Sequence, residues 1–568
     1  MTDVDAGPSL APGQDRLARL PLEILLHITR QLNTADYGAV RLCSRTLEHS
    51  LRYFFLNEYF QCKQFMLTEL SLQRLLAFAQ HPDISQTLCN VTIGVEGFCR
   101  GYKNHPEDEE LATTLIMLAA DQKALMANGR AVQMLSAAFS LLPNLVTVRL
   151  RDGDSCMQFP NGSYASWSSY GLRHMRQQLG GKAEKLLTTA YSPDFSSRAF
   201  SLVVAALAQT KTRPPILDVA VKMRQCALNY QAFDLTPAPR LYVQGGSGED
   251  GVNVYAYAVL AGLRRLQLTL QCGYHPQEQE SGEFVVGVPP FKVRAARAFA
   301  EYLPVRAWLA HCPNIEWLCL NLLEEACIYN NEFLNELYSP LPDFYSLPPA
   351  SPASRDITMP FASHLRRFGL GTASCNVDVL LELLGRFPAL EHLSLRDFSL
   401  VYETRNPPTV WKDFLVSLVK SPLGAQLKHL SLTRVGTAAS AENYPRMFKT
   451  HGLTFNGLDS VEYNAKAEKS MAFWLQNMVV RIVAEPGVYD TGLGSGDSDE
   501  FDYGTFADWL SDSEYGSDAE QEGDGEHEAN GEGEDNVILL LLNLNTSDNL
   551  GTKGGNPEAE SAILESGV

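Results

Sequence analysis

The sequence lacks the long apolar runs of membrane proteins and the leader of secreted ones. Even the run from Val537 to Leu542 is far shorter than the roughly 18 residues that a membrane helix requires. Residues 1–16 carry four charged residues and no apolar core, which is not the pattern of a secretory signal. We therefore expect a soluble protein of the cytoplasm, the nucleus or both, without membrane contact.

Common signatures of catalytic chemistry are also missing. The chain has no GxxxxGK[ST] phosphate loop, no GxSxG nucleophile elbow, no HExxH zinc helix and no EF-hand loop. The glycine-rich segment Gly492–Gly496 has no predicted strand before it and no helix after it, which favours a flexible linker. We expect a protein that is not an enzyme and that holds no cofactor, although an unrecognised catalytic site stays open as an alternative.

Cysteine spacing gives no support to a metal site. The 11 cysteines are scattered, none in a CxxC pair, and the closest group (Cys312, Cys319 and Cys327) has no histidine at ligand spacing. A structural zinc site needs four convergent ligands. An odd number of cysteines also fits poorly with a complete disulfide framework. The sequence predicts buried free thiols and no metal.

Charge is distributed very unevenly. Residues 482–568 contain 22 acidic residues and one lysine, a net of −21, so residues 1–481 have a net charge of +1. This balance disfavours nucleic acid as a partner, because binding phosphates needs an excess of lysine and arginine. Residues 1–16 are predicted to be disordered, and residues 486–568 to form a disordered acidic tail. In this tail Ser511 and Ser517 each precede a glutamate by three residues, which makes them candidate phosphorylation sites.

Residues 17–60 have the pattern of a compact helical module. Pro21 suits the first position of a helix, where its missing N–H costs nothing, and apolar residues then recur at helical spacing. The segment resembles the F-box, whose motif steps appear here as Leu20-Pro21, Glu23-Ile24-Leu25, Ile28, Asp36-Tyr37 and Arg41-Leu42-Cys43-Ser44-Arg45. Two departures are mild: Leu42 and Cys43 vary the last step, and Tyr37 stands where leucine is commoner.

The resemblance implies a partner for the first helix. F-box helices bind the helical groove of a Skp-family adaptor, and through that adaptor a cullin, by spaced apolar anchors. The matching positions are Leu20, Pro21, Leu22, Ile24, Leu25 and Ile28. The alternative is a three-helix segment whose apolar face packs on its own chain.

Residues 61–485 contain a recurring template, P-x-h-x-x-h-x-h, where h is apolar. It occurs in full at Pro143–Leu150, Pro313–Leu320 and Pro388–Leu395, and without proline at segments that begin with Leu88, Leu263, Leu365, Leu427 and Leu458. The final h-x-h indicates a half-buried strand, and helical patterns precede several of the strands. The sequence therefore predicts an α/β fold with parallel strands.

This template resembles the leucine-rich repeat, in which neighbouring units stack into a solenoid. This sequence departs from the repeat in its period. Starting at Leu263, the first apolar residues of successive templates lie 52, 50, 25, 37 and 31 residues apart, and insertions occur at Gln271–Pro290 and Glu324–Pro360. An ordinary α/β domain is the alternative. The whole layout resembles fungal F-box proteins with degenerate leucine-rich repeats.

Polar residues alternate with the leucines and would line the concave side of such a solenoid. We expect substrate contacts from Arg149, Arg151, Asn321, Ser394, Arg396 and Thr433. Stacking of the strands would also gather several further cations on one side of the sheet: Arg264, Arg265, Arg366, Arg367, Lys428 and Arg434. The acidic tail would be attracted to such a surface, or would serve only as a solubilising or partner-binding appendage.

Together these features predict the substrate-recognition subunit of a Skp–cullin–F-box ubiquitin ligase. The helical module would bind the adaptor, and the repeats would bind a protein substrate that the sequence does not identify. The alternative is a scaffold that uses the same repeat surface without any ligase.

Overall fold

The computed structural model describes two compact units of the chain. The described residues are 17–32, 34–98, 109–158, 164–179, 193–221, 226–233, 258–271, 304–322, 327–338, 359–402, 408–439, 451–455, 458, 460–466, 470–476 and 480–482. One unit holds the described residues up to Phe60 together with those of Cys156–Trp167, and the other holds the remainder. The segments predicted to be disordered, with Ser511 and Ser517, lie outside the described residues. No helix among the described residues is long and apolar enough to cross a membrane.

The first unit consists mainly of short helices. They are a 3-10 turn η1 (Leu17–Arg19) and the helices α1 (Leu22–Thr29), α2 (Thr34–Leu42) and α3 (Arg45–Phe60). Pro21 lies one residue before α1 rather than inside it, and its carbonyl accepts hydrogen bonds from the backbone N–H groups of Ile24 and Leu25 at 3.0 and 3.1 Å. Ser44 begins α3, because its Oγ accepts from the Leu47 N–H as a helix cap does.

Apolar side chains from all three helices form the core of this unit. Leu25 of α1, Tyr37 of α2, and Leu51 and Phe55 of α3 are each at most 2% exposed. The Tyr37 and Phe55 rings meet edge to face at 5.3 Å, an arrangement that aromatic rings favour. The strands β4 (Ser155–Gln158) and β5 (Tyr164–Trp167) pair in a separate two-stranded sheet.

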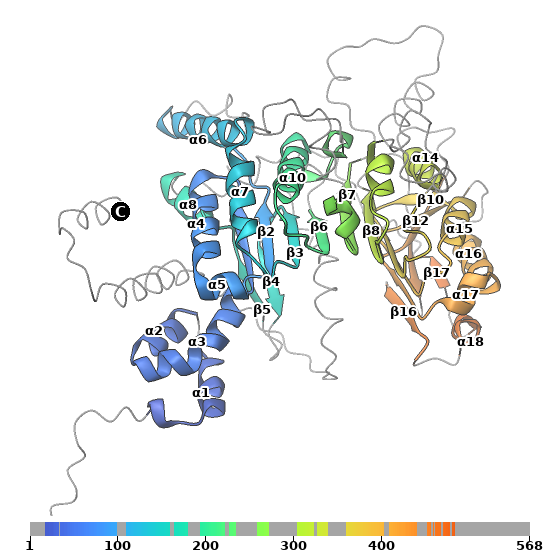
Figure 1. Ribbon diagram of the computed structural model, residues 1–568. Coiled ribbons are helices and arrows are strands. Elements are labelled where there is room, and N and C mark those ends of the chain that lie inside the picture. The colour runs from blue at the N-terminus through green and yellow to red at the C-terminus, as the bar shows by residue number, and fades with distance from the viewer. Residues whose placement is uncertain are drawn as a thin grey trace, which may run out of the picture. The chain divides into compact units, whose positions relative to one another are not determined.

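The second unit is built on a ten-stranded sheet whose strands lie in chain order (Figure 1). They are β1 (Cys62–Met66), β2 (Asn90–Gly94), β3 (Thr147–Arg151), β6 (Ile216–Ala220), β7 (Arg265–Leu270), β8 (Trp317–Leu322), β9 (Arg367–Gly371), β11 (His392–Arg396), β13 (His429–Thr433) and β16 (Ser460–Asn464). All neighbours are parallel except β16, which runs antiparallel to β13. The predicted mixed α/β fold with a parallel sheet is confirmed.

Helices alternate with these strands, as predicted. They are α4 (Glu69–Gln80), α5 (Pro82–Thr87), α6 (Glu109–Ala127), α7 (Arg130–Ser140), α8 (Leu172–Leu179), α10 (Pro193–Ala208), α14 (Cys327–Tyr338), α15 (Val377–Gly385), α16 (Pro408–Lys420), α17 (Pro422–Gln426) and α18 (Met471–Gln476), with a 3-10 turn η5 (Tyr230–Phe233). Neighbouring helices pack on one another, α4 against α7 and α7 against α10, and Figure 1 shows them beside β2 and β3.

The strand register explains why the template repeats. The second and fourth residues of each strand align across the sheet, as Val148 and Leu150 of β3 and Leu393 and Leu395 of β11 show, and these four are fully buried. Side chains of a strand alternate between its two faces, so the first, third and fifth residues lie on the opposite face, which we call the polar face.

The asparagine that follows proline in two templates stabilises the stack. Asn144 Nδ2 donates to the Gln86 carbonyl at 2.7 Å, and Asn314 Nδ2 donates to the Ala261 carbonyl at 2.8 Å. Each bond ties the turn before one strand to the helical segment that comes before the neighbouring strand of the sheet. The third template has Ala389 at this position and therefore no such amide.

A second, smaller sheet was not predicted. Its strands are β10 (Ser374–Asn376), β12 (Ser399–Tyr402), β14 (Gly436–Ala439), β15 (His451–Phe455) and β17 (Val480–Ile482). The chain passes from the main sheet into it through Thr372, Asp397 and Arg434, whose φ angles are 50°, 49° and 48°.

The expectation of a parallel strand after Leu458 is wrong. This segment forms the antiparallel edge strand β16, and Leu458 itself is 64% exposed. An antiparallel strand turns back along its neighbour instead of extending the crossover pattern, so the template ends at β13.

Candidate functional site

The start of α1 exposes a small apolar surface. Pro21 is exposed, Leu22 is 37% and Ile24 48% exposed, and Leu20 and Ile28 are half-buried. We call these five residues the α1 surface. Leu25, the sixth residue predicted to bind the adaptor, is only 2% exposed and packs inside the unit. Five of the six predicted residues therefore reach the surface, and Leu25 holds the helix that presents them.

An ion pair between a buried arginine and a partly buried glutamate joins α2 to α3. Arg41 of α2 donates from Nε and Nη2 to the Glu48 carboxylate of α3 at 2.9 and 2.8 Å, and its guanidinium lies 3.8 Å above the Phe55 ring. Burial lowers the pKa of Arg41, and Glu48 opposes that shift. Two parallel hydrogen bonds of this kind fix geometry as well as charge, so the arginine of the motif is structural.

The polar face of the main sheet holds the predicted substrate residues, in separate places. Ser394 and Arg396 on β11 align with Ser431 and Thr433 on β13, so Arg396 and Thr433 are direct neighbours. Asn321 lies on β8 and donates to Thr269 Oγ1 at 3.4 Å.

Arg149 lies on β3, five strands away from β11 in the sheet order, or roughly 24 Å at the usual strand spacing. Its Nη2 donates to the buried Asp218 carboxylate at 3.1 Å. Arg151 is only 2% exposed. The structure therefore brings Ser394, Arg396 and Thr433 together and leaves the two β3 arginines apart.

Sequence reasoning placed less weight on the first residue of each strand. Arg265 of β7, Trp317 of β8 and Arg367 of β9 align as first residues. The Cζ atoms of Arg265 and Arg367 lie 3.9 and 5.0 Å from the centre of the Trp317 ring. Arg265 and Arg367 are among the cations that the sequence predicted for one side of the sheet, whereas Trp317 was missed. Alternation along the strand would have found it, because the residue before L-x-L points to the same side as its middle residue.

The remaining predicted cations do not join this face. Arg264, Arg366 and Lys428 come directly before their strands and alternate with Glu316 and Glu391 along the edge where the strands begin. Arg264 Nη1 lies 2.6 Å from Glu316 Oε1, and Lys428 Nζ lies 2.7 Å from Glu391 Oε1. Lys428 also lowers the pKa of the Glu391 carboxyl. The alternating signs leave these three cations and two carboxylates with a net charge of only +1.

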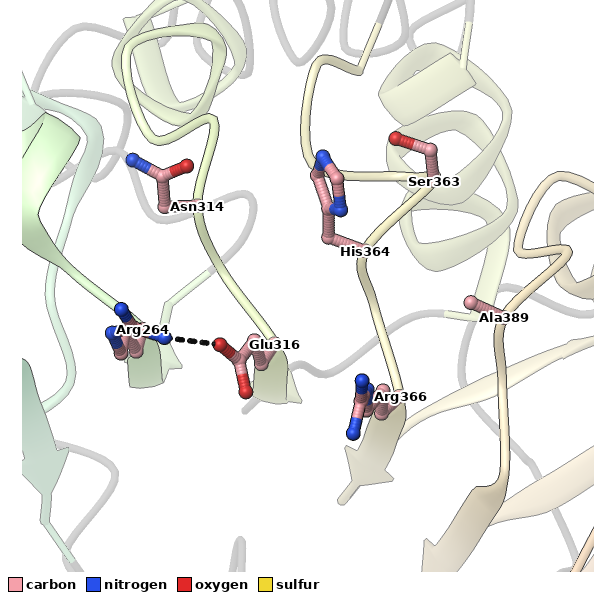
Figure 2. A pocket seen from close by; sticks show the side chains of 7 residues that line it. All are labelled: Arg264, Asn314, Glu316, Ser363, His364, Arg366 and Ala389. Carbon is pink, nitrogen blue, oxygen red and sulfur yellow. Dashed lines mark hydrogen bonds and ion pairs between the residues drawn. The ribbon is translucent and has the colours of Figure 1, made fainter.

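A shallow cavity of about 210 Å³ lies at the same edge. Figure 2 shows Arg264 facing Glu316, with Arg366 directly before the next strand, β9, and with Asn314, Ser363 and His364 around the rim. Arg264 and Glu316 already pair with one another, and no nucleophile–base hydrogen bond joins the residues that line the cavity in Figure 2. We assign it no chemistry.

A buried carboxyl group lies beyond the end of β2. Glu96 is 4% exposed, and its Oε1 accepts from Ser169 Oγ at 2.8 Å and from Gln64 Nε2 at 3.4 Å. Burial raises the pKa of Glu96 to about 7, and Asp154 and Asp152 add to the shift. Among the residues that the structure describes, no three histidine, cysteine, aspartate or glutamate side chains gather as metal ligands would.

Comparison with protein families identifies a known domain in the first unit. Residues 17–58 match the F-box domain, which confirms that part of the predicted resemblance. No curated protein matches the chain.

Among solved structures the chain is similar to the crystal structure of the Rad7 and Elc1 complex in yeast. The identity is 9%, the alignment covers 75% of this chain and 90% of that chain, and the TM-score is 0.17. A score this low carries no argument about fold or function.

Proposed function

We propose, from the premise of an F-box domain at residues 17–58, that this protein is the substrate-recognition subunit of a Skp–cullin–F-box ubiquitin ligase. An F-box domain implies binding of a Skp-type adaptor. The observation that carries the proposal is the α1 surface, where Ile24 is 48% exposed although it is apolar. Spaced apolar anchors on a helix are the means by which helices dock into grooves.

The second unit would hold the substrate. We infer that it is an irregular leucine-rich-repeat-like solenoid, because its strands add in chain order and each buries its apolar pair. Its polar face offers Arg149, Asn321, Ser394, Arg396 and Thr433, whereas Arg151 contributes no surface in this conformation.

The protein itself would be non-catalytic and need no cofactor. A receptor of this kind brings a substrate lysine close to a conjugating enzyme bound elsewhere on the complex, and proximity alone raises the reaction rate greatly. A location in the cytoplasm, the nucleus or both stays a prediction.

Affinity purification of the tagged full chain from cells tests this proposal. The variant Ile24→Asp places a charge on the α1 surface, and the matched control Ile116→Asp places one at a 65% exposed residue of the second unit. We expect adaptor and cullin to copurify with the wild type and the control, and neither with Ile24→Asp. Adaptor without cullin would favour the non-ligase scaffold, and absence of both from the wild type would refute the proposal.

A further inference from the structure

Two cysteines lie side by side where the main sheet begins. Cys62 is the first residue of β1, and Cys89 directly precedes Asn90, the residue of β2 that pairs with Cys62. The Cys89 N–H donates to the Gln61 carbonyl at 3.1 Å. Neighbouring strands lie about 4.8 Å apart and successive residues about 3.3 Å apart along a strand, which places the Cα atoms of the two cysteines about 6 Å apart. This separation lies within the range that a disulfide spans.

One amide group joins the two sulfur atoms. Asn90 Nδ2 donates to Cys62 Sγ at 3.0 Å and to Cys89 Sγ at 3.5 Å, so the two sulfurs are at most 6.5 Å apart. A single side-chain torsion positions each sulfur. Formation of a bond between them therefore requires rotation of two side chains and release of the Asn90 amide, while the register of the strands is kept.

Both thiols are free and partly accessible to solvent. Cys62 and Cys89 are each half-buried, which leaves a path for a small oxidant. Among the cysteines that the structure describes, these two alone share a hydrogen-bonding group. Of the other described cysteines, one is exposed and four are buried: Cys43 is exposed, and Cys226, Cys312, Cys319 and Cys375 are buried.

The surroundings of the pair decide how fast it reacts. Burial raises the pKa of Cys62, and the Asn90 amide, Arg149 and Lys63 oppose that rise. Burial also raises the pKa of Cys89. Because the thiolate is the form that reacts, we expect slow oxidation at neutral pH and faster oxidation as the pH rises.

We propose that Cys62 and Cys89 form a reversible disulfide when hydrogen peroxide oxidises the protein. One thiolate attacks an oxygen of the peroxide, the O–O bond breaks, and a sulfenic acid forms while the departing hydroxide takes up the thiol proton as water. The second thiol attacks the sulfenic sulfur, the S–O bond breaks, and the hydroxyl group leaves as water. Two thiols thus lose two electrons and two protons, and one peroxide becomes two water molecules.

The disulfide would fasten the beginning of the second unit. Cys62 is the second residue of that unit, and the bond would close a loop that contains α4 and α5. Closing a loop stabilises a fold mainly by restricting the unfolded chain. Cytoplasmic reductants keep thiols of this kind reduced, so the bond would form under oxidative conditions. The inference goes beyond the proposed ligase function and does not depend on it.

Peptide mapping of the full-length protein tests the bond. The protein is treated with hydrogen peroxide, remaining thiols are blocked with N-ethylmaleimide, and a tryptic digest is analysed by mass spectrometry without reductant. Trypsin releases Cys62 in residues 53–63 and Cys89 in residues 75–100, which also contain Cys99. We expect the two peptides to be joined in the wild type and in Cys99→Ser. They should be separate in Cys62→Ser, in Cys89→Ser and after treatment with dithiothreitol.

Two further measurements accompany the mapping. The oxidised wild type should melt at a higher temperature than the reduced protein, and this difference should vanish in Cys89→Ser. The matched control Cys43→Ser changes an exposed cysteine and should keep both the bond and the difference. The initial rate of bond formation should rise between pH 7 and pH 9, and a rate that does not rise would contradict attack by these thiols.

Several results would overturn the inference while the proposed function stands. These are a joined peptide that persists in Cys89→Ser and disappears in Cys99→Ser, a bond between separate molecules, or sulfinic acid at both cysteines without any bond. Should a serine variant fail to fold, fragmentation of the joined peptide from the wild type identifies the bonded cysteine directly. Loss of adaptor binding, in contrast, would bear on the proposed function alone.

Discussion

Two neighbouring residues of α1, Ile24 and Leu25, have opposite roles. Ile24 is 48% exposed on the α1 surface, whereas Leu25 is 2% exposed in the core of the first unit. The motif alone could not separate them, because both are apolar and both fall within helical spacing. Burial is decided by the packing of α2 and α3, which the sequence of α1 does not contain.

We predict that alanine substitutions at these two positions differ sharply. Leu25→Ala should destabilise the first unit by about 2–5 kcal/mol, because it leaves a cavity in a closed core. Ile24→Ala should change stability by no more than about 0.5 kcal/mol, as exposed substitutions usually do. Hydrogen exchange of peptides from residues 17–60 in the full chain measures both, and similar exchange rates in the two variants would contradict this assignment.

Glu96 should make the stability of the second unit depend on pH. Its pKa in the folded chain is raised from 4.5 to about 7, so folding favours the neutral carboxyl. The resulting stabilisation is fully present below the unfolded pKa and is lost as pH rises through about 7. We expect Glu96→Gln to raise the melting temperature at pH 8 relative to the wild type, and to do so by less at pH 5. An equal shift at both pH values would show that Glu96 does not titrate in this range.

At the scale of elements, the strands of the main sheet were predictable and the second sheet was not. The L-x-L pairs located β3, β8 and β11 because burial of one face leaves a period of two. The chain enters the smaller sheet through a left-handed residue that follows a strand of the main sheet. These left-handed residues are Thr372, Asp397 and Arg434. None of these is glycine, so no sequence signal marked the bend.

The left-handed conformation at Thr372 gives an element-scale prediction. The left-handed conformation costs a residue with a side chain about 1–2 kcal/mol of folding free energy. Glycine avoids this cost, but it loses about 0.5–1 kcal/mol more than other residues in backbone entropy when the chain folds. Thr372→Gly should therefore stabilise the second unit by up to about 1 kcal/mol, since Thr372 is exposed and its N–H bond to the Arg396 carbonyl is kept. Thr433→Gly on the extended strand β13 should destabilise it. Urea unfolding measures both, and destabilisation by Thr372→Gly would contradict the prediction.

At the scale of the whole molecule, the two units carry surfaces of different chemistry. The α1 surface is apolar, and the polar face is basic around Trp317. The sequence predicted both kinds of surface. Because the repeat period is irregular, however, the predicted substrate residues were distributed over strands from Arg149 to Thr433 and not at one place. Strand register, which the sequence did not supply, shows that Arg265 and Arg367 meet on Trp317.

Calorimetric titration of a purified Skp-family adaptor into the full chain tests the central claim most directly. The account predicts saturable binding to the wild type. It predicts no measurable binding to the double variant Leu20→Ala, Pro21→Ala, which should keep the wild-type melting profile because Pro21 is exposed and Leu20 half-buried. Unchanged adaptor affinity in that folded double variant would contradict the account.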